Sequence, residues 1–145
     1  DGKQKEEFKK MIRQSHLAHK IFLLGWKQDV YPYLVKSNIF TLSTHYEGFP
    51  FVLLEAMRVG LPIVATNVLF GPAELLGKRS TYGLLVRPED HVDLADKLAQ
   101  LIQNKKLRRR YHDRSLVRMR HFTESKMLQN YRQIINQSVN IYNEK

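Results

Sequence analysis

Residues 38–66, NIFTLSTHYEGFPFVLLEAMRVGLPIVAT, decide the fold. The two short apolar runs at 38–43 and 62–66 have the length and branched side chains of buried β-strands. Between them, residues 51–59 have apolar side chains at helical spacing, and Gly60 is a typical helix stop signal. A strand, a helix and a second strand in this order predict two parallel strands joined by a crossover helix.

The rest of the chain extends this pattern. Further elements are expected as an amphipathic helix over 3–19, a buried strand at 20–25, a short helix from Asp29 to about Ser37, a strand at 82–86, a helix capped by Asp90, a basic helix from about 105 and a last helix capped by Thr123. The last helix has an apolar stripe made of Met127, Leu128, Tyr131, Ile134, Ile135 and Tyr142. Together they predict an α/β fold, a Rossmann-like parallel sheet with flanking helices, followed by C-terminal helices over about 105–145.

Composition places the chain among soluble globular proteins. Its 145 residues, 43% of them hydrophobic, suffice for one folded domain with a core. The longest uncharged apolar runs are far shorter than the ~20 residues that a membrane span needs, and no run resembles a signal peptide. The chain has no cysteine, which excludes disulfides, thiolate zinc sites and cysteine nucleophiles and is typical of a reducing compartment. We therefore expect a cytoplasmic location, and no metal site because no HxH or HxxxH pair occurs.

The net charge of +10 is concentrated near the end of the chain. Residues 105–145 carry 11 Lys and Arg against 3 Asp and Glu, whereas the rest carries 13 against 11. Most of the excess lies in 105–120, KKLRRRYHDRSLVRMR, which suits an anionic membrane surface or nucleic acid. The other interpretation is a solvated helix face that turns Leu107, Tyr111 and Leu116 inward. Nucleic acid is the less favoured partner because aromatic residues for base stacking are sparse there.

The loop 44–50 and the helix after it carry the chemistry. Gly48 allows a sharp backbone turn and a close approach to a ligand. The amides of Phe51, Val52 and Leu53 open the helix, where backbone N–H groups lack partners within the helix. Together with the helix dipole they predict an anion site suited to phosphate.

Two carboxylates accompany this anion site, Glu47 in the loop and Glu55 in the helix. Glu55, one turn into the helix, can accept hydrogen bonds from a vicinal diol such as a ribose, and Glu47 can accept them from sugar hydroxyls. These residues indicate a cradle for a nucleotide sugar. The alternative, which the residues alone leave open, is an ordinary strand–loop–helix connection with two solvated glutamates.

Four ordered blocks resemble the family 4 glycosyltransferases, which have the GT-B fold. EGFPFVLLEAM at 47–57 resembles the E-x7-E motif of that family. Three further blocks follow it with similar spacing: RVGLPIVATN at 58–67, FGPAELL at 70–76 and YGLLVRPED at 82–90. The resemblance covers residues 21–103. Within the family, the sequence blocks are most similar to those of capsule and exopolysaccharide enzymes.

The resemblance implies a function and a set of roles. Such a protein is a retaining transferase that moves a hexose or N-acetylhexosamine from a UDP- or GDP-sugar to an acceptor hydroxyl in polysaccharide or glycolipid synthesis, without an essential metal or other cofactor. Glu55 would bind the ribose, and Glu47 would lie beside the reacting carbon, as a nucleophile or as a positioning group. The remaining implied donor contacts are Gly48, Phe49, Pro50, Phe51 and Val52 for the diphosphate and sugar, with Gly25 and Trp26 for the base.

The resemblance also implies missing parts. DGKQKEEFKK at 1–10 resembles the segment just after the second strand of the family's C-terminal domain. We therefore expect residues 1–145 to be a single partial domain that lacks two strands, the acceptor-binding N-terminal domain and the Arg/Lys pair for the diphosphate. The chain alone is then expected to be inactive, and a sugar or lipid-linked acceptor to bind through the missing domain.

Two partners follow from this view of the chain. The missing strands would lie between the strands at 21–25 and 38–43, so exposed sheet edges are expected to favour dimerisation. Because many relatives act on lipid-linked acceptors, 105–120 is also a candidate for peripheral attachment to the inner face of the membrane.

Two other functions are a glycosidase and a non-catalytic binding module. A glycosidase with paired carboxylates is disfavoured, because one carboxylate lies in a helix suited to diol binding and no second acidic loop accompanies it. A non-catalytic basic binding module on a Rossmann-like scaffold stays open, because a fold alone does not fix a function.

Overall fold

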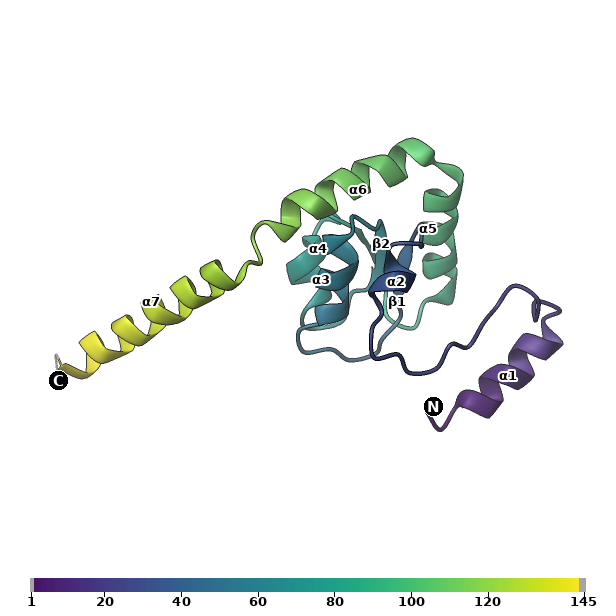
Figure 1. Cartoon of the computed structure of the whole chain (residues 1–145), viewed down its shortest axis with the longest axis horizontal. Helices are drawn as coiled ribbons and strands as arrows, with labels where there is room; N and C mark the ends of the chain where they lie inside the picture. Colours follow the sequence, from purple (N-terminus) through teal and green to yellow (C-terminus); the bar gives the residue numbers. More distant parts are fainter. Residues whose placement is uncertain (1, 144–145) are drawn as a thin grey trace. The chain divides into compact units, whose positions relative to one another are not determined.

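The structure is a computed structural model that describes residues 2–143, and their side chains as far as Val139 (Figure 1). The chain separates into two compact units, Asp1–Pro32 and Tyr33–Lys145.

The first unit contains the helix α1, Lys5–Gln14, which is amphipathic but shorter than the predicted 3–19. The predicted buried strand at 20–25 is wrong, because these residues have no strand structure and their apolar side chains are exposed, Phe22 by 71%. A parallel strand is held by the ladder of hydrogen bonds to its neighbours. None of the described strands pairs with residues 20–25, so an apolar run alone does not make a strand here.

The short helix α2, Tyr31–Leu34, spans the boundary between the units. Asp29 stands before it as predicted, with its Oδ1 accepting a hydrogen bond from the Tyr31 amide at 2.9 Å. The helix ends three residues sooner than the predicted Ser37.

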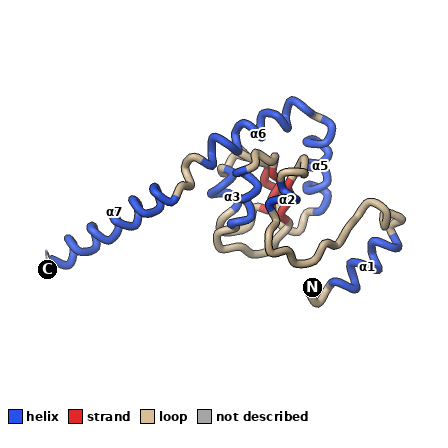
Figure 2. The backbone as a smooth tube through the Cα atoms, viewed as in Figure 1, coloured by secondary structure: helices blue, strands red, loops and turns tan. Residues whose placement is uncertain are grey.

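The second unit is built on a parallel sheet of three strands in the order β1-β2-β3. Figure 2 shows the strands in red among the helices of this unit. The strands are β1, Phe40–Leu42, β2, Ile63–Thr66, and β3, Leu84–Val86. Each lies within a predicted strand and is shorter than predicted. Thr41 is in register with Val64, which is in register with Leu84 on the other side. The α/β class and the parallel sheet are therefore confirmed.

Helices cover this sheet: α3, Phe51–Arg58, α4, Pro72–Leu76, α5, His91–Gln103, and α6, Lys105–Met119, with α7, Glu124–Asn143, after them. The predicted helix boundaries at Gly60 and Asp90 are confirmed. Gly60 adopts a φ of +74°, which a glycine after a helix tolerates best.

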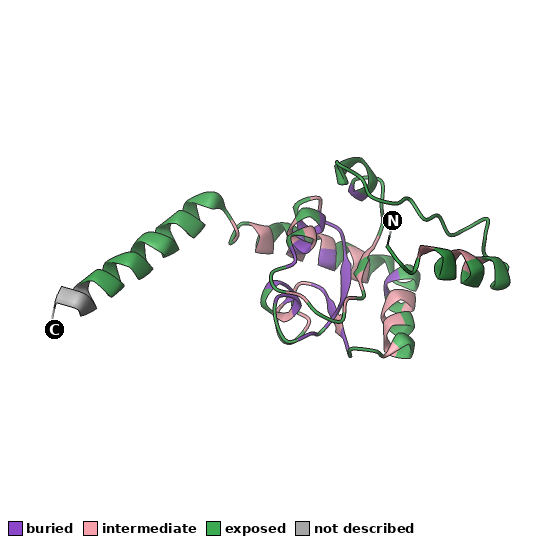
Figure 3. Cartoon of the chain, turned by 90° about the horizontal axis from the view of Figure 1, so that it is seen from below, coloured by how far each residue is buried: buried purple, intermediate pink, exposed green. Residues whose placement is uncertain are grey.

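Two apolar cores lie on opposite faces of the sheet. In the central strand β2, Ile63 and Ala65 point into one core and Val64 into the other, as expected for alternating side chains. The first core includes Leu53, Ala56 and Met57 of α3 and Leu75 and Leu76 of α4, and the second includes Leu101 of α5 and Tyr111 of α6. Figure 3 shows the buried residues gathered around the sheet. Both faces of β2 are thus covered, which is typical of parallel sheets.

The basic segment 105–120 is partly structural. Three arginines of α6 donate to backbone carbonyls elsewhere in the unit: Arg108 to Leu101 and Ile102, Arg114 to Thr81, and Arg118 to Glu74 and Leu75. Most of these carbonyls lie at the C-terminal ends of α4 and α5, where helices leave acceptors without partners. The cationic side chains that remain exposed are Lys105, Lys106, Arg109, Arg110 and Arg120.

The apolar residues of α6 follow the predicted inward face only in part. Tyr111 is buried, and its hydroxyl donates to the Ser80 carbonyl at 3.1 Å. Burial raises the pKa of Tyr111. Leu107 is half-buried against the second core, whereas Leu116 is exposed, contrary to the prediction.

The apolar stripe of α7 is exposed. Its exposed members are Met127, Leu128, Tyr131, Ile134, Ile135 and Val139, and the side chain of Tyr142 lies outside the described residues. Neither α7 nor any other described helix has an apolar stretch long enough to cross a membrane.

The cap of α5 leads to a pH prediction. The Asp90 Oδ1 accepts from the Asp93 amide at 2.8 Å, and the Arg87 Nη2 lies 2.6 Å from the Asp90 Oδ2. The hydrogen bond from the Asp93 amide, and after it the charge of Arg87, lower the pKa of Asp90 below its ordinary 3.8. Ionised Asp90 therefore stabilises the fold above pH 3.8, and this stabilisation is lost as the pH falls through the lowered pKa.

We expect the chain to be more stable than its Asp90→Asn variant at pH 7, and the difference to shrink as the pH falls to about 3. Asparagine keeps an acceptor for the Asp93 amide but cannot ionise. Urea unfolding of both proteins across this range checks the prediction. A difference that stays constant with pH would contradict it.

Candidate functional site

The loop 43–50 leaves the carboxyl end of β1, the edge at which open parallel sheets bind ligands. Thr66, the last residue of β2, donates its Oγ1 hydrogen to the Thr44 carbonyl at 2.6 Å. This hydrogen bond ties the start of the loop to the central strand. Sequence reasoning missed Thr66, although a hydroxyl residue ending an apolar strand was a usable signal.

The turn before α4 supports the other end of the loop. Gly71 has a φ of +90°, and a Cβ there would overlap the Pro50 Cδ and lie 2.8 Å from the Gly48 carbonyl oxygen. Only glycine fits both the dihedral angle and the space. The FGPAELL block thus acts on the loop through backbone packing, a role that was missed in the sequence.

Gly48 itself is not needed for a sharp turn, contrary to the prediction. Its φ lies outside the left-handed region, and a Cβ there would meet no atom within 4 Å. The fold would accommodate a side chain at this position. What Gly48 provides is open space above the loop backbone, which suits a close approach by a ligand.

The N-terminus of α3 is open to a ligand. Among the described helices, the longer α5, α6 and α7 have side-chain caps, from Asp90, Asn104 and Thr123 respectively. Pro50 precedes α3 and makes no such hydrogen bond. The amides of Phe51 and Val52 have no acceptor among the described residues, whereas the Leu53 amide donates to the Pro50 carbonyl at 2.9 Å. The predicted anion site therefore keeps two of its three donors.

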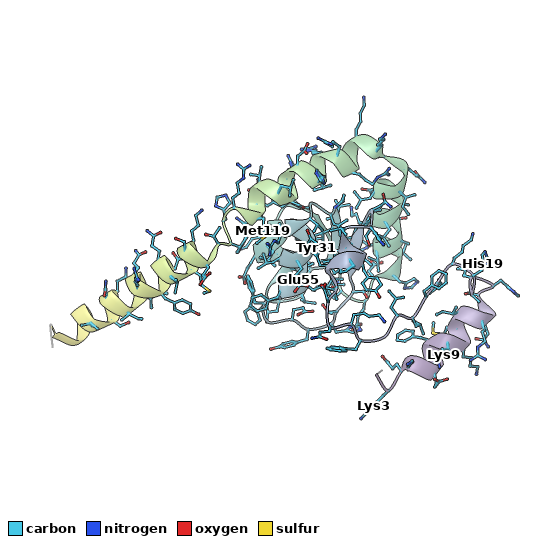
Figure 4. The ribbon with its side chains drawn as sticks, viewed as in Figure 1. Lys3, Lys9, His19, Tyr31, Glu55 and Met119 are labelled. Carbon is cyan, nitrogen blue, oxygen red and sulfur yellow. The ribbon has the colours of Figure 1, made fainter. Side chains whose placement is uncertain are left out.

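Both predicted carboxylates are available to a ligand. Glu55 is exposed on the side of α3 opposite the buried Leu53 and Met57, one turn after the exposed Phe51 (Figure 4). Glu47 is half-buried in the loop. Within residues 2–143, neither carboxylate forms a hydrogen bond or an ion pair with the protein. The carboxylate oxygens of both residues therefore remain available as acceptors for a ligand.

The other predicted donor contacts are divided between the two units. Of the loop residues, Phe49 is exposed, Pro50 is buried and Val52 is half-buried. Gly25, with a φ of +67°, and the exposed Trp26 lie in the first unit. The structure thus places the residues predicted to contact the phosphate, the sugar and the ribose on one loop and helix. All of these contacts, and that with the base, stay predictions.

Comparison with known proteins identifies the class. The model of the family described as "Glycosyl transferases group 1" matches residues 1–116, and the chain belongs to this family. It is 29% identical over 127 residues to the N-acetylgalactosamine-N,N'-diacetylbacillosaminyl-diphospho-undecaprenol 4-alpha-N-acetylgalactosaminyltransferase of Campylobacter jejuni, covering 88% of this chain and 34% of that protein.

Solved structures agree on the fold. A TarM mutant of Staphylococcus aureus in complex with fondaparinux, alpha-GlcNAc-glycerol and UDP has a TM-score of 0.83 and 24% identity, covering 93% of this chain and 27% of that one. HepE of Anabaena in complex with UDP has a TM-score of 0.81 and 20% identity, covering 91% of this chain and 36% of that one. These likenesses show a GT-B fold. The chain thus spans between 27% and 36% of the length of these three relatives.

Proposed function

We propose that the chain is the donor-binding part of a retaining glycosyltransferase. It would serve the transfer of a hexose or N-acetylhexosamine from a UDP-sugar, or a GDP-sugar, to an acceptor hydroxyl in polysaccharide or glycolipid synthesis. The observation that carries the proposal is the open N-terminus of α3, where the Phe51 and Val52 amides lie one turn from the exposed Glu55. The relatives add support, because two were crystallised with UDP and a third is named as a transferase of N-acetylgalactosamine.

The geometry suits the departure of a nucleoside diphosphate. When the bond between the sugar carbon and the β-phosphate oxygen breaks, negative charge grows on the phosphate. The amides of Phe51 and Val52 and the dipole of α3 are already oriented to stabilise that charge. The acceptor oxygen bonds to the sugar carbon, and its proton passes to the departing phosphate. On this proposal, no metal ion and no separate base are required.

The carboxylates have distinct roles in this proposal. Glu55 accepts hydrogen bonds from the ribose hydroxyls and so fixes the nucleoside beside the helix N-terminus. Glu47, in the loop, lies next to the donor sugar and acts at or near the reacting carbon. Gly48 allows the sugar to lie close to the loop backbone, and Gly25 and Trp26 provide the contact for the base.

The chain alone is proposed to be an inactive, partial domain. In the described sheet β1 pairs only with β2, so its outer edge is free to pair with another strand. We assign this edge to the two strands of the family's C-terminal domain that precede the chain, and acceptor binding to the N-terminal domain. In the isolated chain the same edge would favour dimerisation.

We propose a cytoplasmic location because the chain has no cysteine, and an anionic membrane as a partner because the segment 105–120 is basic. Within 105–120, the side chains proposed to face an anionic membrane are the five exposed cations, since Arg108, Arg114 and Arg118 hold backbone carbonyls. Nucleic acid remains the less favoured partner, because the buried Tyr111 cannot stack on bases.

Calorimetric titration of the full-length protein with UDP and with GDP tests the proposed function. Binding of one of these nucleoside diphosphates is the expected result. If neither binds, the non-catalytic basic module becomes the better description.

A further inference from the structure

Aromatic rings join the loop to the end of α6. The Phe49 ring packs edge-on against Phe51 with 5.5 Å between centroids, and it lies 6.2 Å from the Phe122 ring. Phe122 is half-buried just beyond α6, and its amide donates to the Met119 carbonyl at 3.0 Å. The end of the loop therefore rests on a residue that is distant in the sequence.

Arg118 holds Phe122 in place. Its guanidinium carbon lies 4.8 Å from the centre of the Phe122 ring and 5.0 Å from that of Tyr82. The same guanidinium donates to the Leu75 carbonyl at 3.1 Å and to the Glu74 carbonyl at 2.6 Å. Because a planar guanidinium can stack and donate at once, Arg118 connects the end of α4, the end of α6 and the loop.

We propose that Phe122 is a positioning residue for donor binding. Its ring, held by Arg118, sets the Phe49 side chain and through it the backbone that leads to the open amides of Phe51 and Val52. This inference rests on the proposed function. Thr66 holds the start of the loop, whereas Gly71 and the Phe49–Phe122 contact both hold its end.

The physical reason is preorganisation. Phe49 is 40% exposed, so the protein surrounds it only in part. Without the Phe122 ring, the side chain gains rotational freedom and the loop must be ordered when the donor binds. An aromatic pair of this kind is worth about 0.5–1.5 kcal/mol, so UDP affinity should fall by about 2- to 13-fold.

Three variants of the full-length protein test this role. Phe122→Leu keeps apolar volume against the first core but removes the ring, Phe122→Tyr keeps the ring, and Leu116→Ala changes an exposed apolar residue on the preceding helix α6. We expect Phe122→Leu alone to weaken UDP binding by about 2- to 13-fold. It should also shift the Phe49 and Phe51 amide resonances of the ligand-free protein, which a general loss of stability would not do selectively.

The outcomes separate this inference from the proposed function. If the unaltered protein binds UDP and Phe122→Leu binds it equally well, only the positioning role is refuted. If the unaltered protein binds neither UDP nor GDP, the proposed function fails and this inference fails with it. Weakening by Phe122→Tyr to the same extent as by Phe122→Leu would also refute a role for the ring.

Discussion

Glu55→Ala should weaken UDP binding to the full-length protein by about 1–3 kcal/mol, roughly 5- to 150-fold, the scale for losing charge-assisted hydrogen bonds. Glu55 is exposed and bonds to none of the described residues, so the substitution removes no contact of the fold. The free energy of unfolding should therefore stay within about 0.5 kcal/mol of that of the unaltered protein. Calorimetry with UDP, together with urea unfolding, measures both quantities.

The chain offers a matched control for Glu55. Glu74, on α4, is also an exposed glutamate without a side-chain partner among the described residues. Its hydrogen bonds are made by its backbone, whose amide donates to the Gly71 carbonyl and whose carbonyl accepts from Arg118. Glu74→Ala should leave UDP affinity nearly unchanged. Equal losses at Glu55 and Glu74 would indicate a general charge effect and count against ribose binding by Glu55.

Gly71→Ala should destabilise the chain by about 2–6 kcal/mol. The backbone at Gly71 has a φ of +90°, which costs about 1–3 kcal/mol for a residue with a Cβ. The added Cβ would also overlap Pro50 and press on the Gly48 carbonyl, and overpacking of this kind costs about 1–3 kcal/mol more. Urea unfolding of the chain measures the effect.

Gly48→Ala is the natural comparison for Gly71→Ala. At Gly48 the backbone is ordinary and a Cβ would meet nothing within 4 Å, so the variant should be as stable as the unaltered chain. The new methyl group would instead occupy space in front of the loop and weaken UDP binding. If Gly48→Ala destabilised the fold as much as Gly71→Ala, the described packing of the loop would be wrong.

The elements set by local signals could be predicted from the sequence. The strands and helices of 38–66 follow from apolar periodicity and from Gly60, and α5 follows from the Asp90 cap. These signals act over a few residues, and in 38–66 the paired strands β1 and β2 reinforce them. The run at 20–25 has the same apolar character but no described strand beside it, and there the prediction failed.

The candidate site was predictable for a similar reason. Glu47, Gly48 and Glu55 lie on one short loop and the helix that follows it, so the sequence alone predicts that they are close together. The residues that support the loop could not be predicted in this way, because Thr66, Gly71 and Phe122 contact it from distant parts of the sequence. The basic run at 105–120 also does not indicate that Arg118 donates hydrogen bonds to backbone carbonyls of this chain instead of binding a partner.

The most direct test follows the two open amides of α3. In the full-length protein labelled with ¹⁵N at phenylalanine and valine, addition of UDP should move the amide resonances of Phe51 and Val52 strongly, as expected for N–H groups that bind a diphosphate. Uridine, which has no phosphate, should move them far less. If UDP bound while both resonances stayed in place, the diphosphate would lie elsewhere and the proposed donor site would be wrong.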